Sequence, residues 1–121
     1  EPIVWVGWTP HWMNLELPMR YLSDSKNLFG EGNGASDVRT LMASNYAESN
    51  PNLVAFFDQF SFSAEEQSWM IQQYGQEEQP MEEVAKAWIE QHPERVEAML
   101  EGVKTQGGDP AWPEVEKSFS F

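Results

Sequence analysis

The chain has 121 residues, 40% of them hydrophobic and 13% aromatic, which is enough apolar material for one folded domain. Its 20 acidic residues outnumber its 7 basic ones and give a net charge of −13. Because no Lys/Arg cluster is present, the sequence excludes the electrostatic binding of nucleic acid or of an anionic membrane surface. The absence of cysteine excludes disulfides, thiolate zinc sites and cysteine nucleophiles. The acidity is typical of a well-solvated surface, or of a surface suited to high external salt.

The first third of the chain predicts short strands. Residues 3–6 are apolar, with the pattern of a strand buried on both faces, and the Gly and Pro of residues 7–12 predict a loop at its carboxyl end. Residues 14–22 alternate as a half-buried strand, which Pro18 restricts to a sheet edge. Residues 23–37 predict a long surface loop, and residues 38–43 either a strand or the start of a helix. A start inside an apolar run is typical of a strand cut from something longer, so we expect an N-terminal portion to be missing.

The middle of the chain predicts helices. Asn50 and Pro51 suit the N-cap and first position of a helix with a Leu/Phe face over residues 53–60. Residues 63–66 fit a capping box that opens a helix to about residue 74.

The last third predicts two more helices and a tail. Pro80 opens a helix with Trp88 on its apolar face, and His92 and Pro93 end that helix and start the next. Gly102 suits the residue that follows the last helix. The Gly- and Pro-rich tail from residue 105 predicts an extended arm. The expected fold class is therefore α/β, with short strands followed by several helices.

Enzymatic motifs are missing. No Gly-x-Ser-x-Gly or His-Glu-x-x-His pattern occurs, and the glycines of residues 30–34 indicate a flexible loop. Adjacent glutamates, as at residues 65–66, do not face each other on a helix and indicate solvated surface. The two histidines, His11 and His92, stand in different contexts, and a helix-end position before proline makes His92 a capping residue. The sequence predicts no enzyme, no metal site and no cofactor.

The tryptophans are more informative. Trp69 and Trp88 fall on apolar helical faces, which indicates core positions, and Trp112 is expected to cover an apolar patch. Trp8 and Trp12 follow the first predicted strand, where ligands of open α/β sheets bind. These two indoles either pack against the protein, as composition favours, or recognise a cation. A quaternary ammonium ion has no N–H to donate and is held by aromatic faces, Trp being the best.

The loop also carries a resemblance. Gly7-Trp8-Thr9-Pro10-His11-Trp12-Met13, followed by Leu17, Tyr21, Leu22 and Asp24, resembles the glycine betaine and choline/proline-betaine substrate-binding proteins of ABC importers. Asn50-Pro51, Phe60-Ser61-Phe62 and residues 83–89 (Glu-x-Ala-x-x-Trp-Ile) agree with the same family in order. The likeness extends over nearly the whole chain.

The resemblance implies part of a type II periplasmic-binding-protein fold, with residues 1–121 as its C-terminal portion. It implies that the ligand is closed between two lobes, with its trimethylammonium group in an aromatic cage. The ligand-binding residues it indicates are Trp8, His11 and Trp12. The first Trp of the motif, Trp8, is the one that falls on a cage position, and bracing of the loop is the alternative role of His11. Family members are about twice this length or more, so this chain supplies only part of the site. One Trp ring contributes ~0.5–2 kcal/mol of cation–π attraction, whereas micromolar affinity needs a binding free energy of ~8 kcal/mol. The resemblance therefore implies that most of the binding free energy comes from the missing N-terminal portion.

The implied function is capture of glycine betaine or a similar osmolyte and its delivery to an ABC permease, in the periplasm or another extracytoplasmic location. Choline or carnitine is an alternative ligand. A structural or oligomerising fragment without a complete site is a second alternative. A hydrolase is a third, whose turnover would fail when His11 is replaced.

Overall fold

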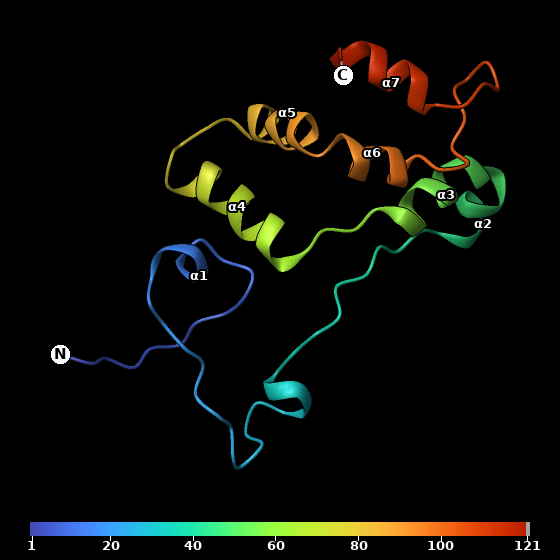
Figure 1. Cartoon of the computed structure of the whole chain (residues 1–121). Helices are drawn as coiled ribbons and strands as arrows, with labels where there is room; N and C mark the ends of the chain where they lie inside the picture. The colour runs from blue at the N-terminus through green and yellow to red at the C-terminus, as the bar shows by residue number, and fades with distance from the viewer. Residues whose placement is uncertain (121) are drawn as a thin grey trace.

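The computed structural model describes residues 1–120, and it is built from helices joined by long extended segments (Figure 1). The elements are α1 (Met13–Glu16), the 3₁₀ turn η1 (Glu31–Asn33), α2 (Ser44–Ser49), α3 (Pro51–Gln59), α4 (Ala64–Gly75), α5 (Met81–Gln91), α6 (Pro93–Met99) and α7 (Trp112–Phe119). Within residues 1–120 no strand forms, and the β-pairing is one antiparallel bridge between Lys104 and Pro110.

The predicted strands do not form within residues 1–120. Residues 3–6 run without a ladder partner, and the side chains of Ile3, Val4 and Val6 are 74–82% exposed. Residues 14–22 form the short helix α1 and then an unpaired segment, and residues 38–43 form neither strand nor helix. A strand is stabilised by hydrogen bonds to a neighbouring strand, and the described residues supply no neighbour. The α/β prediction is therefore not met by residues 1–120 themselves.

The helix predictions based on capping signals are confirmed. Ser63 Oγ accepts from the N–H of Glu66 (3.1 Å), and a Glu66 carboxylate oxygen accepts from the N–H of Ser63 (2.6 Å), which completes a capping box at the start of α4. His92 ends α5 and precedes Pro93, the first residue of α6. Asn50 caps α3 by position only, since its side chain donates to the carbonyl of Tyr46. Gly102 has a φ of 73° but lies two residues past Leu100, the C-cap of α6, and not at the position directly after the cap that the sequence predicts.

The C-terminal tail differs from the predicted extended arm. Residues 104–110 form a turn closed by the Lys104–Pro110 bridge, and residues 112–119 form α7. Pro113 sits in the first turn of this helix, where proline is favourable because its N–H would have no helical partner. Trp112 and Val115 then lie on one face and pack against the core. The Gly- and Pro-rich composition of the tail indicates an extended arm, whereas Pro113 occupies a position at which a helix starts.

The hydrophobic core lies between the helices that follow residue 50. Trp88, 4% exposed, forms its centre together with Val96 and Met99. Partly buried hydrophobic residues pack against this cluster, namely Phe56, Phe62, Trp69, Met70, Ile89, Leu100, Trp112 and Val115. The core prediction for Trp88 is confirmed, Trp69 packs at the edge of the core, and Trp112 covers an apolar patch as expected.

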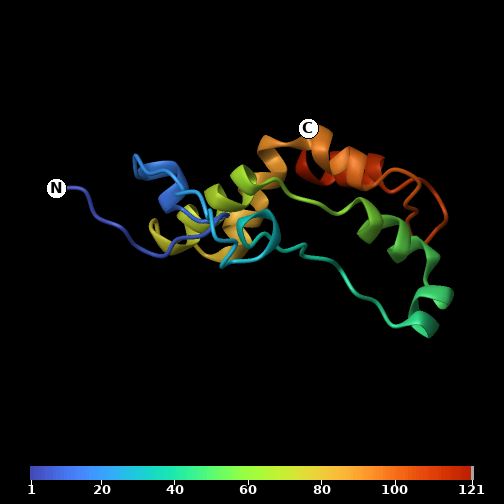
Figure 2. The same cartoon turned by 90° about the horizontal axis from the view of Figure 1, so that it is seen from below.

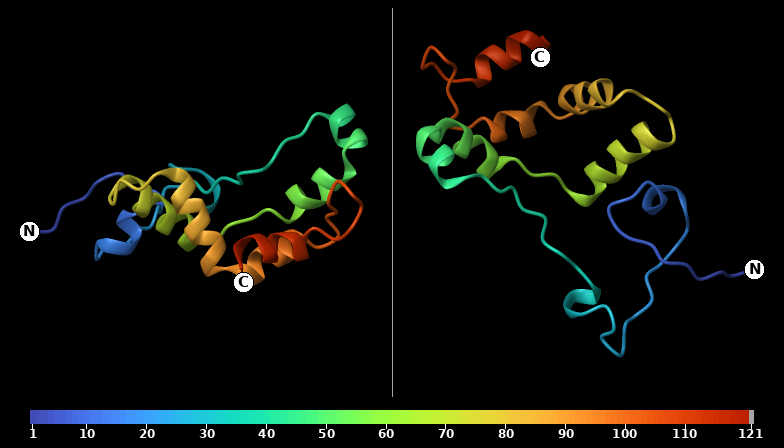
Figure 3. Two further views of the ribbon diagram at one scale, coloured as in Figure 1. Left: turned by 90° about the horizontal axis from the view of Figure 1, so that it is seen from above. Right: turned by 180° about the vertical axis from the view of Figure 1, so that it is seen from behind.

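The arrangement in space separates two parts of the chain. Helices α3 to α7 lie together, with α4 contacting α5 and α6 contacting α3, α5 and α7 (Figures 1 and 2). Residues 1–43 run outside this helical part, apart from α1, which lies beside α4 (Figure 3). The predicted loop over residues 23–37 is confirmed apart from η1. In this loop, a carboxylate oxygen of Asp24 accepts a hydrogen bond from the N–H of Phe29 (2.8 Å). This bond and those from neighbouring backbone amides lower the pKa of Asp24. The region that carries the candidate residues is thus held to the helices mainly through α4.

Candidate ligand-binding site

Residues 7–13, called here the Trp8 loop, contain all three of the predicted ligand-binding residues. Trp8 is 57% exposed, the largest exposure among the six tryptophans, whereas His11 and Trp12 are half-buried. The loop ends in Met13, which is buried and starts α1. Gly7 and Pro10 disfavour regular secondary structure, so the chain forms a loop before α1 begins at residue 13. The Thr9–Pro10 peptide bond in this loop is cis.

The three rings are in contact. The His11 and Trp8 ring centroids lie 5.1 Å apart with their planes at 75°, an edge-on arrangement, and the His11 and Trp12 centroids lie 5.3 Å apart at 43°. Aromatic pairs with such geometry attract because the positive edge of one ring meets the negative face of the other. The loop therefore brings together all three predicted residues, with His11 between the two indoles.

Hydrogen bonds fix His11 in the loop. Its N–H donates to Asn14 Oδ1 (2.8 Å) and to Ser68 Oγ (3.1 Å), and its ring Nδ1 accepts from the N–H of Met13 (3.3 Å). Because Nδ1 accepts, the ring proton of the neutral imidazole sits on Nε2. The prediction that His11 braces the loop agrees with these contacts, and they leave Nε2–H as the ring's polar group.

A second set of contacts holds the outer side of the loop. Thr9 Oγ1 and Tyr21 Oη share a hydrogen bond of 2.6 Å, and Asn14 Nδ2 donates to the same Tyr21 oxygen (3.4 Å). Below the loop, Gln72 of α4 donates to Glu16 of α1 (2.7 Å). Trp8 is thus an exposed indole on a loop in which Thr9, His11 and Met13 are held by hydrogen bonds.

Ser68, Asn14 and Tyr21 were missed as site residues from the sequence. Tyr21 enters the sequence pattern only as an apolar position of the strand expected over residues 14–22 and as part of the family resemblance, and a serine inside a helix 57 residues away gives no signal of its own. Asn14 follows the loop directly, and an Asn beside a helix start is a known acceptor for backbone N–H groups. That signal could have identified Asn14.

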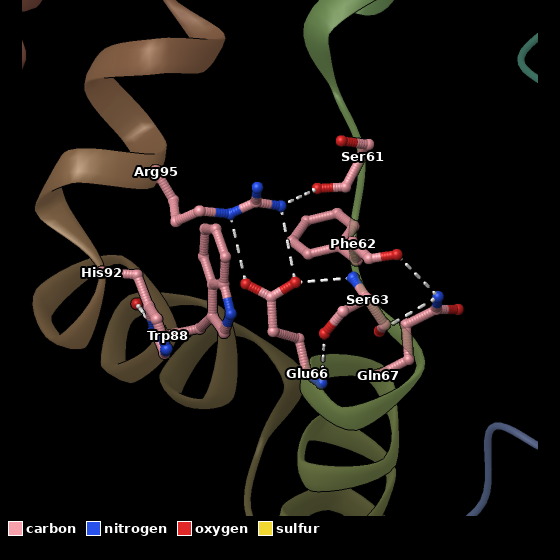
Figure 4. Close-up of polar contacts among 8 residues, drawn as sticks. All are labelled: Ser61, Phe62, Ser63, Glu66, Gln67, Trp88, His92 and Arg95. Carbon is pink, nitrogen blue, oxygen red and sulfur yellow. Dashed lines mark hydrogen bonds and ion pairs between the residues drawn. The ribbon is translucent and has the colours of Figure 1, made fainter.

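The other polar cluster lies between α4, α5 and α6 and is shown in Figure 4. Arg95 donates to the carbonyl of Ser61 (2.7 Å) and pairs with Glu66 (3.3 Å), beside the stacked rings of Trp88 and His92. Partial burial raises the pKa of Glu66, but the N–H and hydroxyl of Ser63 and the charges of Arg95 and His92 together hold this pKa below its usual value. The open depression here, about 640 Å³, is lined by Arg95, Glu66 and Trp88 among others, and the indole N–H of Trp88 is buried there without a hydrogen-bond partner among residues 1–120. The polar cluster of Arg95, Glu66 and Ser61 ties α4 and α6 together, and none of its members belongs to the Trp8 loop.

Neither a metal site nor a membrane-spanning helix is present among the described residues. In the part of the chain that the structure describes, no three His, Cys, Asp or Glu side chains lie close enough to hold a metal ion. None of the helices within residues 1–120 is both long enough and apolar enough to cross a membrane.

The chain thus presents an exposed indole, Trp8, in a Trp-x-Pro-His-Trp loop beside α4. Residues 1–91 match the family described as the substrate binding domain of the ABC-type glycine betaine transport system, and the chain belongs to that family. The glycine betaine/carnitine transport binding protein GbuC of Listeria monocytogenes serotype 1/2a (strain 10403S) is 34% identical over 109 residues, which are 90% of this chain and 35% of that protein.

Among solved structures, the chain is similar to an ABC-transporter choline-binding protein in complex with choline. The TM-score is 0.80 at 28% sequence identity, over 93% of this chain and 39% of that one. The chain therefore spans little more than a third of the length of the proteins it matches. The family resemblance of the sequence is confirmed.

Proposed function

We propose that this chain forms one wall of a cleft in which an ABC importer's substrate-binding protein captures a quaternary-ammonium osmolyte, with glycine betaine as the first candidate. The observation that carries the proposal is the position of Trp8, a 57% exposed indole on an otherwise anchored loop. A trimethylammonium group cannot donate a hydrogen bond, so an aromatic face is the group that can hold it. Choline and carnitine carry the same group and are alternative ligands.

The cage would be completed by residues outside the 121 described by this sequence. One Trp face contributes ~0.5–2 kcal/mol, against ~8 kcal/mol for micromolar affinity. The relatives are about three times as long as the matched stretch, which leaves ample chain for further aromatic rings. In this proposal residues 1–121 are the C-terminal portion of a two-lobed protein that closes on its ligand by a hinge motion. His11 and Trp12 support Trp8 and line the same wall.

The same proposal accounts for the exposed apolar segment at residues 3–6. Its β-branched residues suit a strand buried in a sheet, and a neighbouring strand from the remainder of the protein would complete the α/β architecture expected from the sequence. An acidic surface of −13 net charge and the family's role suit an extracytoplasmic protein that delivers its ligand to an ABC permease.

The test is calorimetric titration of the full-length protein that contains this chain with glycine betaine, choline and carnitine. Trp8→Ala should weaken binding of the preferred ligand at least about tenfold, since that factor corresponds to ~1.4 kcal/mol of lost cation–π attraction. Tyr46→Ala is a matched control, because Tyr46 is an aromatic of similar exposure (51%) on the distant α2. Unchanged affinity in the Trp8 variant would refute the assignment of Trp8 to the cage.

A second control separates binding from folding. Trp88→Ala removes the centre of the core and should lower the free energy of unfolding by about 3–5 kcal/mol, while the surviving folded fraction keeps its affinity. Trp8→Ala should have the reverse pattern, with little change in unfolding free energy. A Trp8 variant that loses binding only because it unfolds would not support the proposal.

A structural or oligomerising role is the second candidate, and the exposure of Val38 (99%) and Leu41 (92%) favours it. If this role is correct, the full-length protein should bind none of the three ligands and should form stable oligomers in analytical ultracentrifugation. A monomer that binds a quaternary ammonium ion would exclude this candidate.

A further inference from the structure

Ser68 has two properties that set it apart within residues 1–120. It is a polar residue that is 1% exposed, the only side chain described as fully buried, and it contacts the backbone of a segment 57 residues away. Its hydroxyl donates to the carbonyl of Ala64 one turn earlier in α4 (2.7 Å), and its oxygen accepts from the N–H of His11 (3.1 Å). The hydroxyl thus links the backbone of α4 to the backbone of the Trp8 loop.

The link acts on Trp8 through His11. The His11 N–H is held by Ser68, and its ring lies edge-on against the indole of Trp8. A displacement of the His11 backbone would move the ring that Trp8 packs against. Since Ser68 is buried, it cannot contact a ligand that enters from solvent.

The helix that carries Ser68 is itself fixed at its start. The capping box between Ser63 and Glu66 closes the first turn of α4, and Arg95 of α6 holds Glu66 from the other side (Figure 4). Ser68 lies one turn further along α4, so the hydroxyl is offered from a rigid element. Binding residues that are held in place before the ligand arrives lose less conformational entropy on binding.

We infer that Ser68 is a positioning residue, whose buried hydroxyl docks the Trp8 loop on α4 and thereby sets the affinity for a quaternary ammonium ligand. The affinity part of this inference rests on the proposed function. The docking part does not, because it concerns the ligand-free protein.

Ser68→Ala removes the hydroxyl with little other change. The His11 N–H keeps Asn14 Oδ1 as an acceptor, and the carbonyl of Ala64 remains in the helical hydrogen-bond ladder, so no buried group is left without a partner. The folded state should therefore survive while the loop loosens. Ser68→Cys has nearly the same size but a weaker acceptor, and should give an intermediate result. Ser118→Ala is the matched control, since Ser118 also donates to a helix carbonyl (2.9 Å) but lies in α7.

The first measurement is amide hydrogen exchange of the ligand-free full-length protein, read at His11. Exchange at His11 should speed up about tenfold in Ser68→Ala and less in Ser68→Cys, and should stay unchanged in Ser118→Ala. Unchanged exchange at His11 in Ser68→Ala would overturn the docking role. If Ser68→Ala does not fold, the same exchange measurement is made on Asn14→Ala, which removes the other acceptor of the His11 N–H. In that variant the His11 amide must remain largely protected from exchange by Ser68.

The second measurement is the dissociation constant for the preferred ligand. Ser68→Ala should weaken binding about three- to tenfold, in line with lost preorganisation, and should have no further effect in a Trp8→Ala background. An equal loss in both backgrounds would show that Ser68 acts independently of Trp8 and would overturn the positioning role. A parent that binds no quaternary ammonium ion refutes the proposed function and the affinity part, while the exchange result still decides the docking part.

Discussion

The His11 ring stands edge-on to the Trp8 indole, at a centroid distance of 5.1 Å and an angle of 75°. Hydrogen bonds join His11 to Met13 within the Trp8 loop, to Asn14 directly after it, and to Ser68 of α4. The most exposed tryptophan of the chain is therefore oriented by a neighbour that is itself fixed on three sides. This relationship makes His11 a supporting residue of the proposed cage.

Replacement of His11 by alanine should weaken ligand binding about two- to tenfold, because an edge-to-face aromatic pair contributes ~0.5–1.5 kcal/mol. The backbone N–H remains, so the docking on Ser68 should persist. Calorimetric titration of the full-length protein measures the effect. His92→Ala is the control, since His92 stacks on Trp88 in the core and should affect stability but not affinity. Equal loss of affinity in the two variants would contradict the role given to His11.

Glu66 should make the stability of the protein pH-dependent in the acid range. Because its pKa is lower in the folded state, the carboxylate stabilises the fold fully above about pH 4.5, and this contribution disappears as the pH falls through the lower folded value. Glu66→Gln should therefore cost about 1 kcal/mol at pH 7, and this cost should shrink as the pH falls through the lowered pKa of Glu66.

Urea denaturation of wild type and Glu66→Gln across this pH range measures the difference. Glu65→Gln is the control, because Glu65 lies in the same first turn of α4 but outside the capping box. A cost of Glu66→Gln that stays constant down to pH 3 would mean that the charge of Glu66 is not what stabilises the helix start.

Asn52 ties α3 to the turn at residues 104–110 through two hydrogen bonds. Its Nδ2 donates to the carbonyl of Lys104 and its Oδ1 accepts from the N–H of Lys104, both at 2.7 Å. Asn52→Asp replaces the donor by a second acceptor that faces a carbonyl oxygen, and should lower the free energy of unfolding by about 1–2 kcal/mol. Asn45→Asp, at an exposed position of α2, should change it by less than about 0.5 kcal/mol. Chemical denaturation of both variants checks this prediction, and equal costs would contradict it.

The sequence predicts those features of the fold that depend on neighbouring residues. The capping box at Ser63 and the helix junction at His92 and Pro93 were predicted because their signals lie within four residues. The strand predicted at residues 3–6 does not form, because its apolar pattern is that of a strand paired and buried in a sheet, and residues 1–120 contain no neighbouring strand. For the site, Trp8 came from the motif, whereas Ser68 depends on a contact between distant segments that no local pattern encodes.

The span of the contacts between the Trp8 loop and α4 has a consequence for the order of folding. The two hydrogen bonds that join the loop and α1 to α4 bridge 57 and 56 residues, whereas α4, α5 and α6 follow one another directly and pack against their successors. Closing a long loop costs more chain entropy than pairing consecutive helices, so local contacts form faster. We therefore expect the helical layer to assemble first and to act as the template on which the Trp8 loop settles. The cage wall would then be among the last parts of this chain to become native.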